Sequence, residues 1–499
     1  MKAMILNMCS QLHVRKQVLL LIFYACICTL VFISTGAVIG YSAVTLPVLT
    51  SNTSSITLNA MEIPFFVSII NISDIIGSIV GLIIMNYGRR STMMICGIIF
   101  SLGWILIASS YNVIQLFVGR SLTGIACGIA IPSFIVYLAE ISIVSWRTVV
   151  TIIPIVAANF GLLIVYLLGF VIQDNWRLIA AFFIIPSILF VLCNIFFIHE
   201  SPGWLLLKGR KEEAKTALLH IRGLHHETIE FQKEFAELIK YIELRNNLEI
   251  SWNCQIDTST SKKTGQWSFH LNAWSMLKSI RRTFLLPEVW KPFVILNVYF
   301  FLQKFSGAYV ILFYTVDIVS AVNIIIDPYF VTVIVGIIQL VGNVICMCCS
   351  SRIGRRPISI VSGVGMSIFL TALSVYLQFF ENTDVATVPL VCILFYVAFA
   401  AFGFNSIPWS MIPEVYPTQY VSGIGQLTSL SSILYGYAVL QLYPIIVTQN
   451  RNALIYSYCI TSIVATLFVT IALPETRGKT KTQIEEEFRG TLPIECRNI

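Results

Sequence analysis

Two ionisable residues, Asp74 and Lys304, stand inside long apolar stretches of the sequence. A charge within a membrane-crossing segment is costly and is a functional candidate by default. The ammonium of Lys304 could bind an anionic substrate or pair with a buried acid. Asp74 is the candidate partner, or a coupling acid, because it lies at mid-depth of its stretch. The structural alternative is that Lys304 extends its flexible chain to the outer membrane interface.

Charged residues also gather where apolar stretches end, in two similar sets. The first set contains Arg89, Arg90, Glu140, Arg147 and Glu200, and the second contains Arg352, Arg355, Arg356, Glu414 and Glu475. Ion pairs between helix ends could hold one side of a helix assembly shut and break when that side opens. Shifting an equilibrium from 1:99 to 99:1 takes about 5.5 kcal/mol, which a small network could approach. The alternative is that these charges only set membrane topology.

The elements that must position these residues are membrane helices. Of the 499 residues, 57% are apolar and only 11% are charged, whereas soluble domains carry about 25% charged residues. Such a chain cannot cover a water-soluble globule, which excludes a soluble enzyme and a disordered protein. Its basic residues lie in short loops, which excludes a nucleic-acid-binding face. Twelve apolar runs approach or exceed the roughly 20 residues that cross a bilayer, at 18–44, 62–86, 91–110, 113–141, 148–172, 178–198, 289–320, 328–350, 357–379, 386–412, 422–448 and 452–473.

The distribution of Lys and Arg predicts the orientation. Basic residues precede the first run, separate runs two and three as well as eight and nine, and follow the last run. The positive-inside rule then places both termini and segment 199–288 in the cytosol. Asn52 begins an Asn-Thr-Ser sequon in the first outer loop and is the candidate glycosylation site. We expect a multi-pass protein of the plasma membrane.

Short motifs recur in the two parts of the chain. Gly-Arg-Arg follows runs two and eight, and a glutamate ends runs four and ten. A repeat of six runs in the same orientation predicts two parallel halves with a substrate site between them near the midplane. The expected divisions are an amino-terminal half at 1–198, a cytosolic linker with amphipathic helices at 199–288, a carboxy-terminal half at 289–473 and a cytosolic tail at 474–499.

The sequence offers little for catalysis, cofactors or metals. Ten of the thirteen cysteines lie in or at the edge of apolar runs, where they are typical packing residues. The six histidines lie in the segments expected in the cytosol, and no GxxxxGK[ST] loop is present. We therefore expect no enzymatic activity, no cofactor and no bound metal.

Several motifs resemble those of the sugar porters of the major facilitator superfamily. The run PSFIVYLAE at 132–140 is similar to their fourth-span signature, and HESPGWL at 199–205 to their PESPRWL. QKFSG at 303–307 resembles their seventh-span QQxSG, Ile407-Pro408-Trp409 their tenth-span PIPW, and PETRGKT at 474–480 their PETKGKT. The matches follow the family's order over essentially the whole chain and look most like the insect trehalose and glucose transporter branch. The resemblance implies an all-α fold of twelve transmembrane helices in two parallel six-helix halves.

The resemblance also implies a sugar site. A sugar is neutral and densely hydroxylated, so its pocket needs amides, hydroxyls and an aromatic face. Gln303 and Trp409 fit those roles, and Tyr314 fits as a gating aromatic. The family's second seventh-span Gln is Lys304 here, and its Asn five positions beyond is Tyr309. These departures leave open a changed substrate, weak transport or lost transport.

The charge sets depart from the family as well. The acid expected three positions before each Gly-Arg-Arg is Met85 in one half and Ser351 in the other. The basic residue expected after Glu414 is Val421. With fewer charges available, we expect a weaker lock at the cytosolic ends of the helices.

The coupling mechanism can also be predicted. Proton-coupled sugar porters carry an Asp after a Gly-Tyr pair in span one, whereas Gly40-Tyr41 is followed here by Ser42. This favours facilitative uniport of a sugar such as glucose or trehalose by alternating access, unless Asp74 substitutes for that acid. The alternatives are a same-fold transporter of another, anionic solute and a transport-dead sugar sensor. The expected partners are a small sugar and the lipid bilayer, with no nucleic acid, and we expect a monomer.

Overall fold

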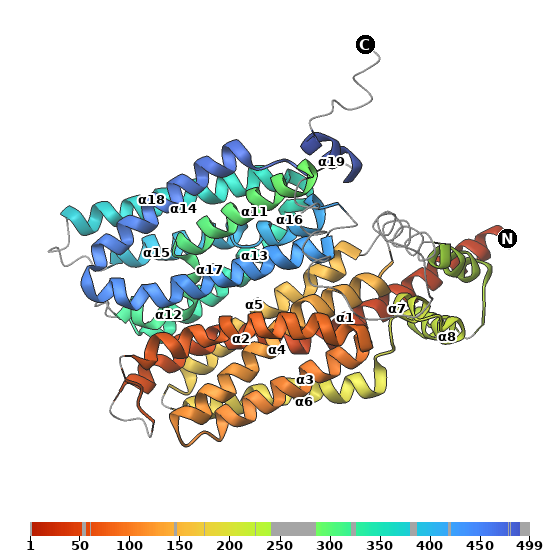
Figure 1. Ribbon diagram of the computed structural model, residues 1–499, viewed down its shortest axis with the longest axis horizontal. Coiled ribbons are helices and arrows are strands. Elements are labelled where there is room, and N and C mark those ends of the chain that lie inside the picture. The colour runs from red at the N-terminus through yellow and green to blue at the C-terminus, as the bar shows by residue number, and fades with distance from the viewer. Residues whose placement is uncertain are drawn as a thin grey trace, which may run out of the picture.

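The computed structural model describes residues 2–51, 56–59, 61–143, 147–173, 175–224, 226–240, 286–320, 326–379, 387–417, 421–477, 479 and 481–489. Within these residues, twelve helices are long and apolar enough to cross a membrane, which confirms the all-α prediction from the apolar runs. Figure 1 shows the helices as two bundles lying side by side.

The amino-terminal half contains six long helices, coloured red to yellow in Figure 1. They are α1 (Lys2–Thr50), α2 (Glu62–Ile84), α3 (Arg89–Ala108), α4 (Val113–Ile141), α5 (Arg147–Val171) and α6 (Trp176–Phe197). Helix α1 packs along α5, α2 packs along α4, and α3 lies against α4 and α6.

The carboxy-terminal half also crosses the membrane six times, but two of its spans are interrupted. Its helices are α11 (Pro287–Phe305), α12 (Ala308–Ser320), α13 (Pro328–Ile353), α14 (Arg355–Phe379), α15 (Thr387–Phe399), the π-helix η2 (Ala400–Phe404), α16 (Ile407–Val415), α17 (Val421–Gln449) and α18 (Arg451–Ala472). The seventh span consists of α11 and α12, and the tenth of α15, η2 and α16.

The breaks in these two spans have local causes. Gly307, between α11 and α12, has a φ of 94°, which an L side chain rarely adopts. A Cβ at Gly307 would also lie 2.6 Å from the ring of Tyr458. In the tenth span, the wider π-turn ends where Ile407 and Pro408 begin α16. The sequence predicted uninterrupted runs at both places, because hydropathy does not report backbone angles.

Glycines set the close approach of helices in the amino-terminal half. A Cβ at Gly36 of α1 would lie 1.7 Å from the carbonyl oxygen of Ala158 in α5. A Cβ at Gly128 of α4 would lie 2.1 Å from the carbonyl oxygen of Asp74 in α2. Small residues at such crossings let backbones touch, which is how membrane helices gain packing energy without a hydrophobic driving force.

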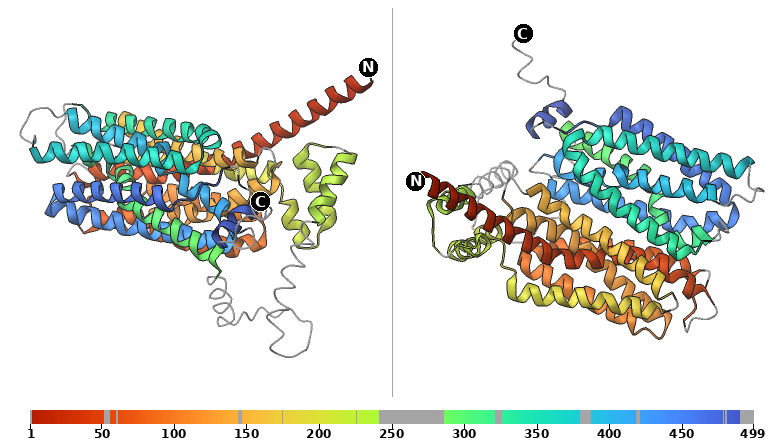
Figure 2. Two further views of the ribbon diagram at one scale, coloured as in Figure 1. Left: turned by 90° about the horizontal axis from the view of Figure 1, so that it is seen from above. Right: turned by 180° about the vertical axis from the view of Figure 1, so that it is seen from behind.

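Short helices gather at one end of the two bundles. Figure 2 shows α7 (Pro202–Leu207), α8 (Lys211–Arg222) and the start of α1 beyond that end, and α19 (Lys481–Arg489) lies there as well. A further helix covers 229–240. We call this end the linker side and the opposite end, where α1 finishes and α2 starts, the far side.

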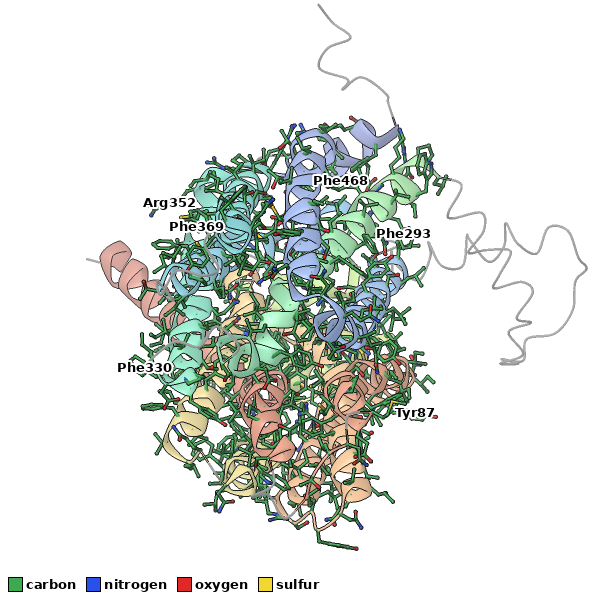
Figure 3. The ribbon with its side chains drawn as sticks, turned by 90° about the vertical axis from the view of Figure 1, so that its left-hand side faces the viewer. Tyr87, Phe293, Phe330, Arg352, Phe369 and Phe468 are labelled. Atoms are coloured by element: carbon green, nitrogen blue, oxygen red, sulfur yellow. The ribbon has the colours of Figure 1, made fainter. Side chains whose placement is uncertain are left out.

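Large apolar side chains cover the outer faces of the bundles. Figure 3 shows Phe330 and Tyr87 at the perimeter, and both are exposed. Ile185 and Leu467, near the middle of α6 and α18, are also exposed. An apolar surface of this kind is what a hydrocarbon environment requires.

We predict that Gly36→Ala destabilises the protein by about 1–3 kcal/mol, because its new methyl group would press on the backbone of α5. The matched control is Gly423→Ala in α17, where an added Cβ meets nothing within 4 Å. The measurement is the thermal unfolding temperature of each purified variant in detergent. Equal unfolding temperatures for Gly36→Ala and wild type would contradict the packing argument.

Candidate functional site

The two halves meet along three helix pairs, α1 with α12, α2 with α17 and α5 with α13. Among the described residues, the hydrogen bonds that join the halves lie in the middle or on the far side. They are Tyr309 to Asn71 (3.1 Å), Tyr166 to the Leu312 carbonyl (2.8 Å), Gln441 to Ser68 (2.7 Å), Asn343 to Asn159 (3.1 Å) and Gln173 to Asp327 (2.9 Å). The interface is therefore closed on the far side in this conformation.

Gln303 lies buried near the end of α11 and contacts the broken tenth span. Its Nε2 donates to the carbonyl oxygens of Phe404 (3.1 Å) and Asn405 (2.9 Å). These carbonyls belong to the π-turn and the residue after it. The Oε1 atom of Gln303 is buried and has no hydrogen-bond partner among the residues that the structure describes. Gln303 thus has one end fixed and an acceptor left over for a ligand hydroxyl.

Lys304 lies next to Gln303 and is only 7% exposed. Its Nζ stands 3.3 Å from the centre of the Tyr309 ring, and the Tyr309 hydroxyl donates across the interface to Asn71. Asp74 lies one turn beyond Asn71 in α2. The Asp74 Oδ1 and Asn71 Nδ2 atoms are buried and have no hydrogen-bond partner in the described part of the chain. The structure therefore brings the predicted residues Lys304, Tyr309 and Asp74 to one stretch of the interface.

The two predicted aromatics lie on either side of this stretch. Tyr314 sits at a kink in α12, where its φ of −124° and ψ of 23° leave the helical range. Its ring packs on Tyr443, with centres 4.5 Å apart. Trp409 is partly buried in α16 and packs edge-on against Phe300 of α11, with centres 4.9 Å apart. Both aromatics thus belong to spans that are kinked or broken.

Two buried polar side chains, those of Asn343 and Arg120, were not predicted from the sequence. Asn343 of α13 donates to Asn159 of α5 and accepts a hydrogen bond from Ser406. Arg120 of α4 is fully buried and donates to the hydroxyl of Ser42 and to the Val38 carbonyl. Each of them is a polar residue inside an apolar run, and this feature of the sequence could have identified it as a candidate.

The arrangement can bind a neutral, hydroxylated molecule. The unpartnered atoms Gln303 Oε1 and Asp74 Oδ1 are acceptors, and the Asn71 Nδ2 atom is a donor. No group of three or more potential metal-ligating side chains occurs among the residues that the structure describes.

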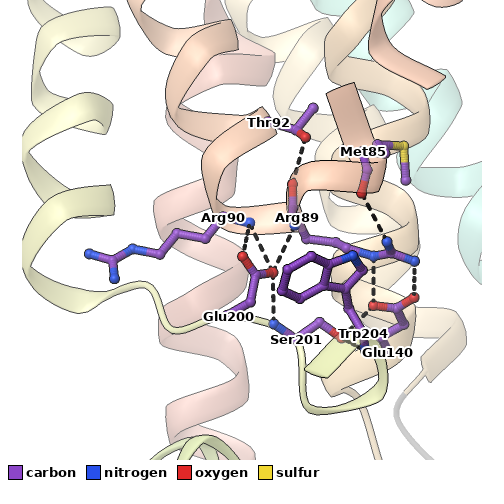
Figure 4. A network of polar contacts seen from close by, with 9 residues as sticks. Met85, Arg89, Arg90, Thr92, Glu140, Glu200, Ser201 and Trp204 are labelled. Atoms are coloured by element: carbon purple, nitrogen blue, oxygen red, sulfur yellow. Dashed lines mark hydrogen bonds and ion pairs between the residues drawn. The ribbon is translucent and has the colours of Figure 1, made fainter. Parts of the chain in front are cut away.

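The first charge set forms a network at the linker side of the amino-terminal half (Figure 4). The Arg89 guanidinium makes two hydrogen bonds to the Glu140 carboxylate, at 2.9 and 3.2 Å. Glu200 accepts from the backbone N–H groups of Arg89 and Arg90, the first residues of α3. An acid at a helix N-terminus is stabilising there. The Met85 carbonyl, at the position where the family carries an acid, accepts from Arg89 (3.1 Å).

The second charge set repeats this network in the carboxy-terminal half. Arg355 pairs with Glu414 at 2.6 Å, and Glu475 accepts from the backbone N–H groups of Arg355 and Arg356 at the start of α14. Each network therefore joins helices of its own half. Arg352 is exposed, and the described contacts include no hydrogen bond or ion pair to it. Asn52 and the side chain of Arg147 lie outside the described residues.

The linker helices are tied to the first network. Arg222 of α8 donates to the Ile141 carbonyl at the end of α4 (2.8 Å) and pairs with Glu234 (2.6 Å). The rings of His199 and His220 stack with centres 4.8 Å apart. Burial and the neighbouring His220 lower the pKa of His199, so His199 is largely neutral at pH 7.

The chain is similar to known transporters over most of its length. It is 28% identical over 464 residues to the facilitated trehalose transporter Tret1 of Apis mellifera ligustica, covering 91% of this chain and 86% of that one. The Bombyx mori Tret1 is 27% identical, covering 91% and 85%.

Solved structures show the same fold. The inward open conformation of the xylose transporter XylE from E. coli has a TM-score of 0.72 at 22% identity and covers 94% of this chain and 99% of that one. The fold is thus that of the major facilitator superfamily, as the motifs indicated. The family model described as sugar (and other) transporter matches residues 21–488, and the chain belongs to that family.

Proposed function

We propose that this protein moves a neutral sugar such as glucose or trehalose down its gradient by alternating access between the two halves. The unpaired amide oxygen of Gln303 in the closed interface carries the proposal, because a hydroxyl is the group that satisfies it without adding charge. The named substrate of the trehalose transporters at 27–28% identity supports a sugar as the ligand. The anionic-solute and sensor alternatives are tested by the same uptake assay.

Uniport is the proposed mode of transport. The acid that proton-coupled sugar porters carry in span one is replaced by Ser42, which accepts a hydrogen bond from the buried Arg120. Because a hydroxyl does not ionise in the physiological range, position 42 has no acid to bind a proton, and Asp74 is the acid that could substitute for it.

The proposed setting is the plasma membrane, with a monomer whose termini and linker lie in the cytosol. The linker side is then cytosolic and the far side is extracellular, so the present conformation is closed to the outside. The division into two six-helix halves, a linker and a tail follows the packing of α1–α6 and of α11–α18.

The first prediction concerns Gln303. We expect saturable uptake of radiolabelled glucose or trehalose by cells expressing the protein, and a loss of about tenfold or more in Gln303→Ala, since unpaired buried groups cost about 1–3 kcal/mol. The control is Gln115→Ala, whose side chain also donates to a backbone carbonyl but lies at the far-side end of α4. An absence of uptake by protein shown to reach the surface would rule out these sugars as substrates.

The second prediction concerns coupling. Wild-type uptake should be unchanged when an ionophore collapses the proton gradient. Ser42→Asp should gain sensitivity to the ionophore, because it places a titratable carboxylate beside Arg120. Ser42→Ala, which removes the hydroxyl without adding an acid, should not gain this sensitivity. Wild-type uptake that depends on the proton gradient would overturn the uniport proposal.

The third prediction concerns the two charge networks, which we propose hold the helix ends of each half together while the halves move. Glu140→Gln and Glu414→Gln should each slow sugar exchange by about tenfold, because each leaves a partly buried arginine without its carboxylate. Glu213→Gln removes an ion pair whose two side chains are 51% and 55% exposed, so it should have no effect. Equal rates of sugar exchange in all three variants would show that the charges of the two networks only set the membrane topology.

A further inference from the structure

The linker helix α8 contacts the amino-terminal half through a pair of histidine rings. His199 lies between α6 and α7, and His220 lies in the last turn of α8. The two imidazole rings are stacked, with their centres 4.8 Å apart and their planes 11° from parallel. The pair therefore makes a face-to-face contact between α8 and the chain that leaves the sixth span.

His199 is held in place by two helices of the bundle. The hydroxyl of Tyr137 in α4 donates to the backbone carbonyl of His199 (3.0 Å), and the hydroxyl of Tyr24 in α1 lies 3.3 Å from the His199 Nδ1 atom. His199 is partly buried, whereas His220 is exposed on α8. One ring of the pair is thus fixed to the bundle, and the other can exchange protons with water.

The groups that face the two rings oppose a second positive charge. Burial, the neighbouring His220 and Arg90 of α3 lower the pKa of His199, and a hydrogen bond to the Phe197 backbone opposes them only in part. Helix α8 also packs against α1 and α7. The described part of α1 brings the neutral phenol of Tyr24 to the pair, and α7 contains no titratable side chain.

The carboxylates of the surrounding elements are bonded to other groups. They are Glu140 (paired with Arg89), Glu200 (bonded to the backbone N–H groups of Arg89 and Arg90), Glu227 (paired with Lys215) and Glu234 (paired with Arg222). The described ion pairs involve neither histidine ring. The stacked pair therefore has no acid at hand to compensate two protons.

Proton binding is consequently linked to the docking of α8. Two imidazoles at this distance would place like charges face to face if both were protonated, whereas separated rings in water can each bind a proton near pH 6.5. The docked state thus binds fewer protons than the released state, so a fall in pH favours release. The contribution of the pair to docking is present above about pH 6.5 and is lost as the pH falls through the pKa of docked His199.

We propose that the stacked rings of His199 and His220 form a pH-sensitive contact, which docks α8 on the amino-terminal half at neutral pH and releases it in acid. Release also weakens the hydrogen bond from Arg222 of α8 to the Ile141 carbonyl (2.8 Å). Ile141 directly follows Glu140 of the first charge network, so the change reaches the helix ends of this half. The proposal concerns the linker helices and does not depend on which solute the protein carries.

The test is hydrogen exchange of the α8 amides in the purified full-length protein at about pH 7.5 and about pH 5.5, with labelling times scaled to equal intrinsic exchange. We expect the protection of α8 to fall about three- to tenfold in acid, because one unit of pKa difference changes an equilibrium tenfold. The protection of α14, in the other half, should not change. Equal protection of α8 at the two pH values would overturn the proposal.

The deciding variant is His220→Phe, which keeps a flat ring against His199 but cannot bind a proton. It should keep α8 protected at both pH values. The matched control is His226→Phe, which replaces an exposed histidine of the same linker whose ring makes none of the described contacts. This control should lose protection in acid as the wild type does. An acid response of His220→Phe equal to that of the wild type would assign the response to another group and reject the proposal.

A second measurement does not depend on the folding of His220→Phe. In wild-type protein with isotope-labelled histidine, one imidazole signal should titrate at lower pH than the signals of exposed histidines, because stacked rings titrate as a coupled pair. His220→Gln should move that signal towards the range of the others. Titration of every histidine signal in a single range would contradict the proposed contact.

Discussion

A polar group inside the hydrocarbon layer must find its partner within the protein or in a ligand, because no water is available there. The structure meets this constraint almost everywhere along the interface between the halves. Asn343 joins Asn159 and Ser406, and Gln441 joins Ser68. Among the described residues, the buried atoms without a hydrogen-bond partner include Asn71 Nδ2, Asp74 Oδ1 and Gln303 Oε1, which belong to residues beside Lys304 and Tyr309. The ligand site that we propose lies where these three atoms are available for hydrogen bonds to a ligand.

The broken seventh span contributes Gln303, Lys304 and Tyr309 to this region, and the tenth span supplies the carbonyls that Gln303 contacts. The π-turn covers Ala400–Phe404. The amide of Gln303 donates hydrogen bonds to two backbone carbonyl oxygens at the end of this turn. The break at Gly307 ends α11 beside Lys304, which lies in the last turn of that helix. The amino-terminal half supplies the acid and a frame of closely packed helices fixed by glycines such as Gly128. The two halves are therefore chemically unequal although they repeat one architecture.

The repeat is clearest at the linker side. In each half an arginine that opens a helix pairs with a glutamate that ends another, and a second glutamate accepts from the N-terminal amides of the first helix. The second glutamate lies at the positive end of that helix, where an acid is stabilising. Each network lies within one half, so it joins the helices of that half, and its described contacts do not cross the interface.

The sequence by itself determined the twelve spans, their helical character and the family. The spans and their helical character follow from the lengths of the apolar runs, because a segment that crosses a bilayer must be apolar and must satisfy its own backbone hydrogen bonds. The family follows from motifs that occur in the family's order along the chain. It also indicated Gln303, Lys304 and Asp74, because polar residues are rare in such runs. Only the tertiary structure decided which of them meet. Composition and periodicity do not encode backbone angles, which produce the break at Gly307 and the π-turn. They also do not encode contacts between helices far apart in the chain, such as the hydrogen bonds from Arg120 to Ser42 and from Tyr309 to Asn71.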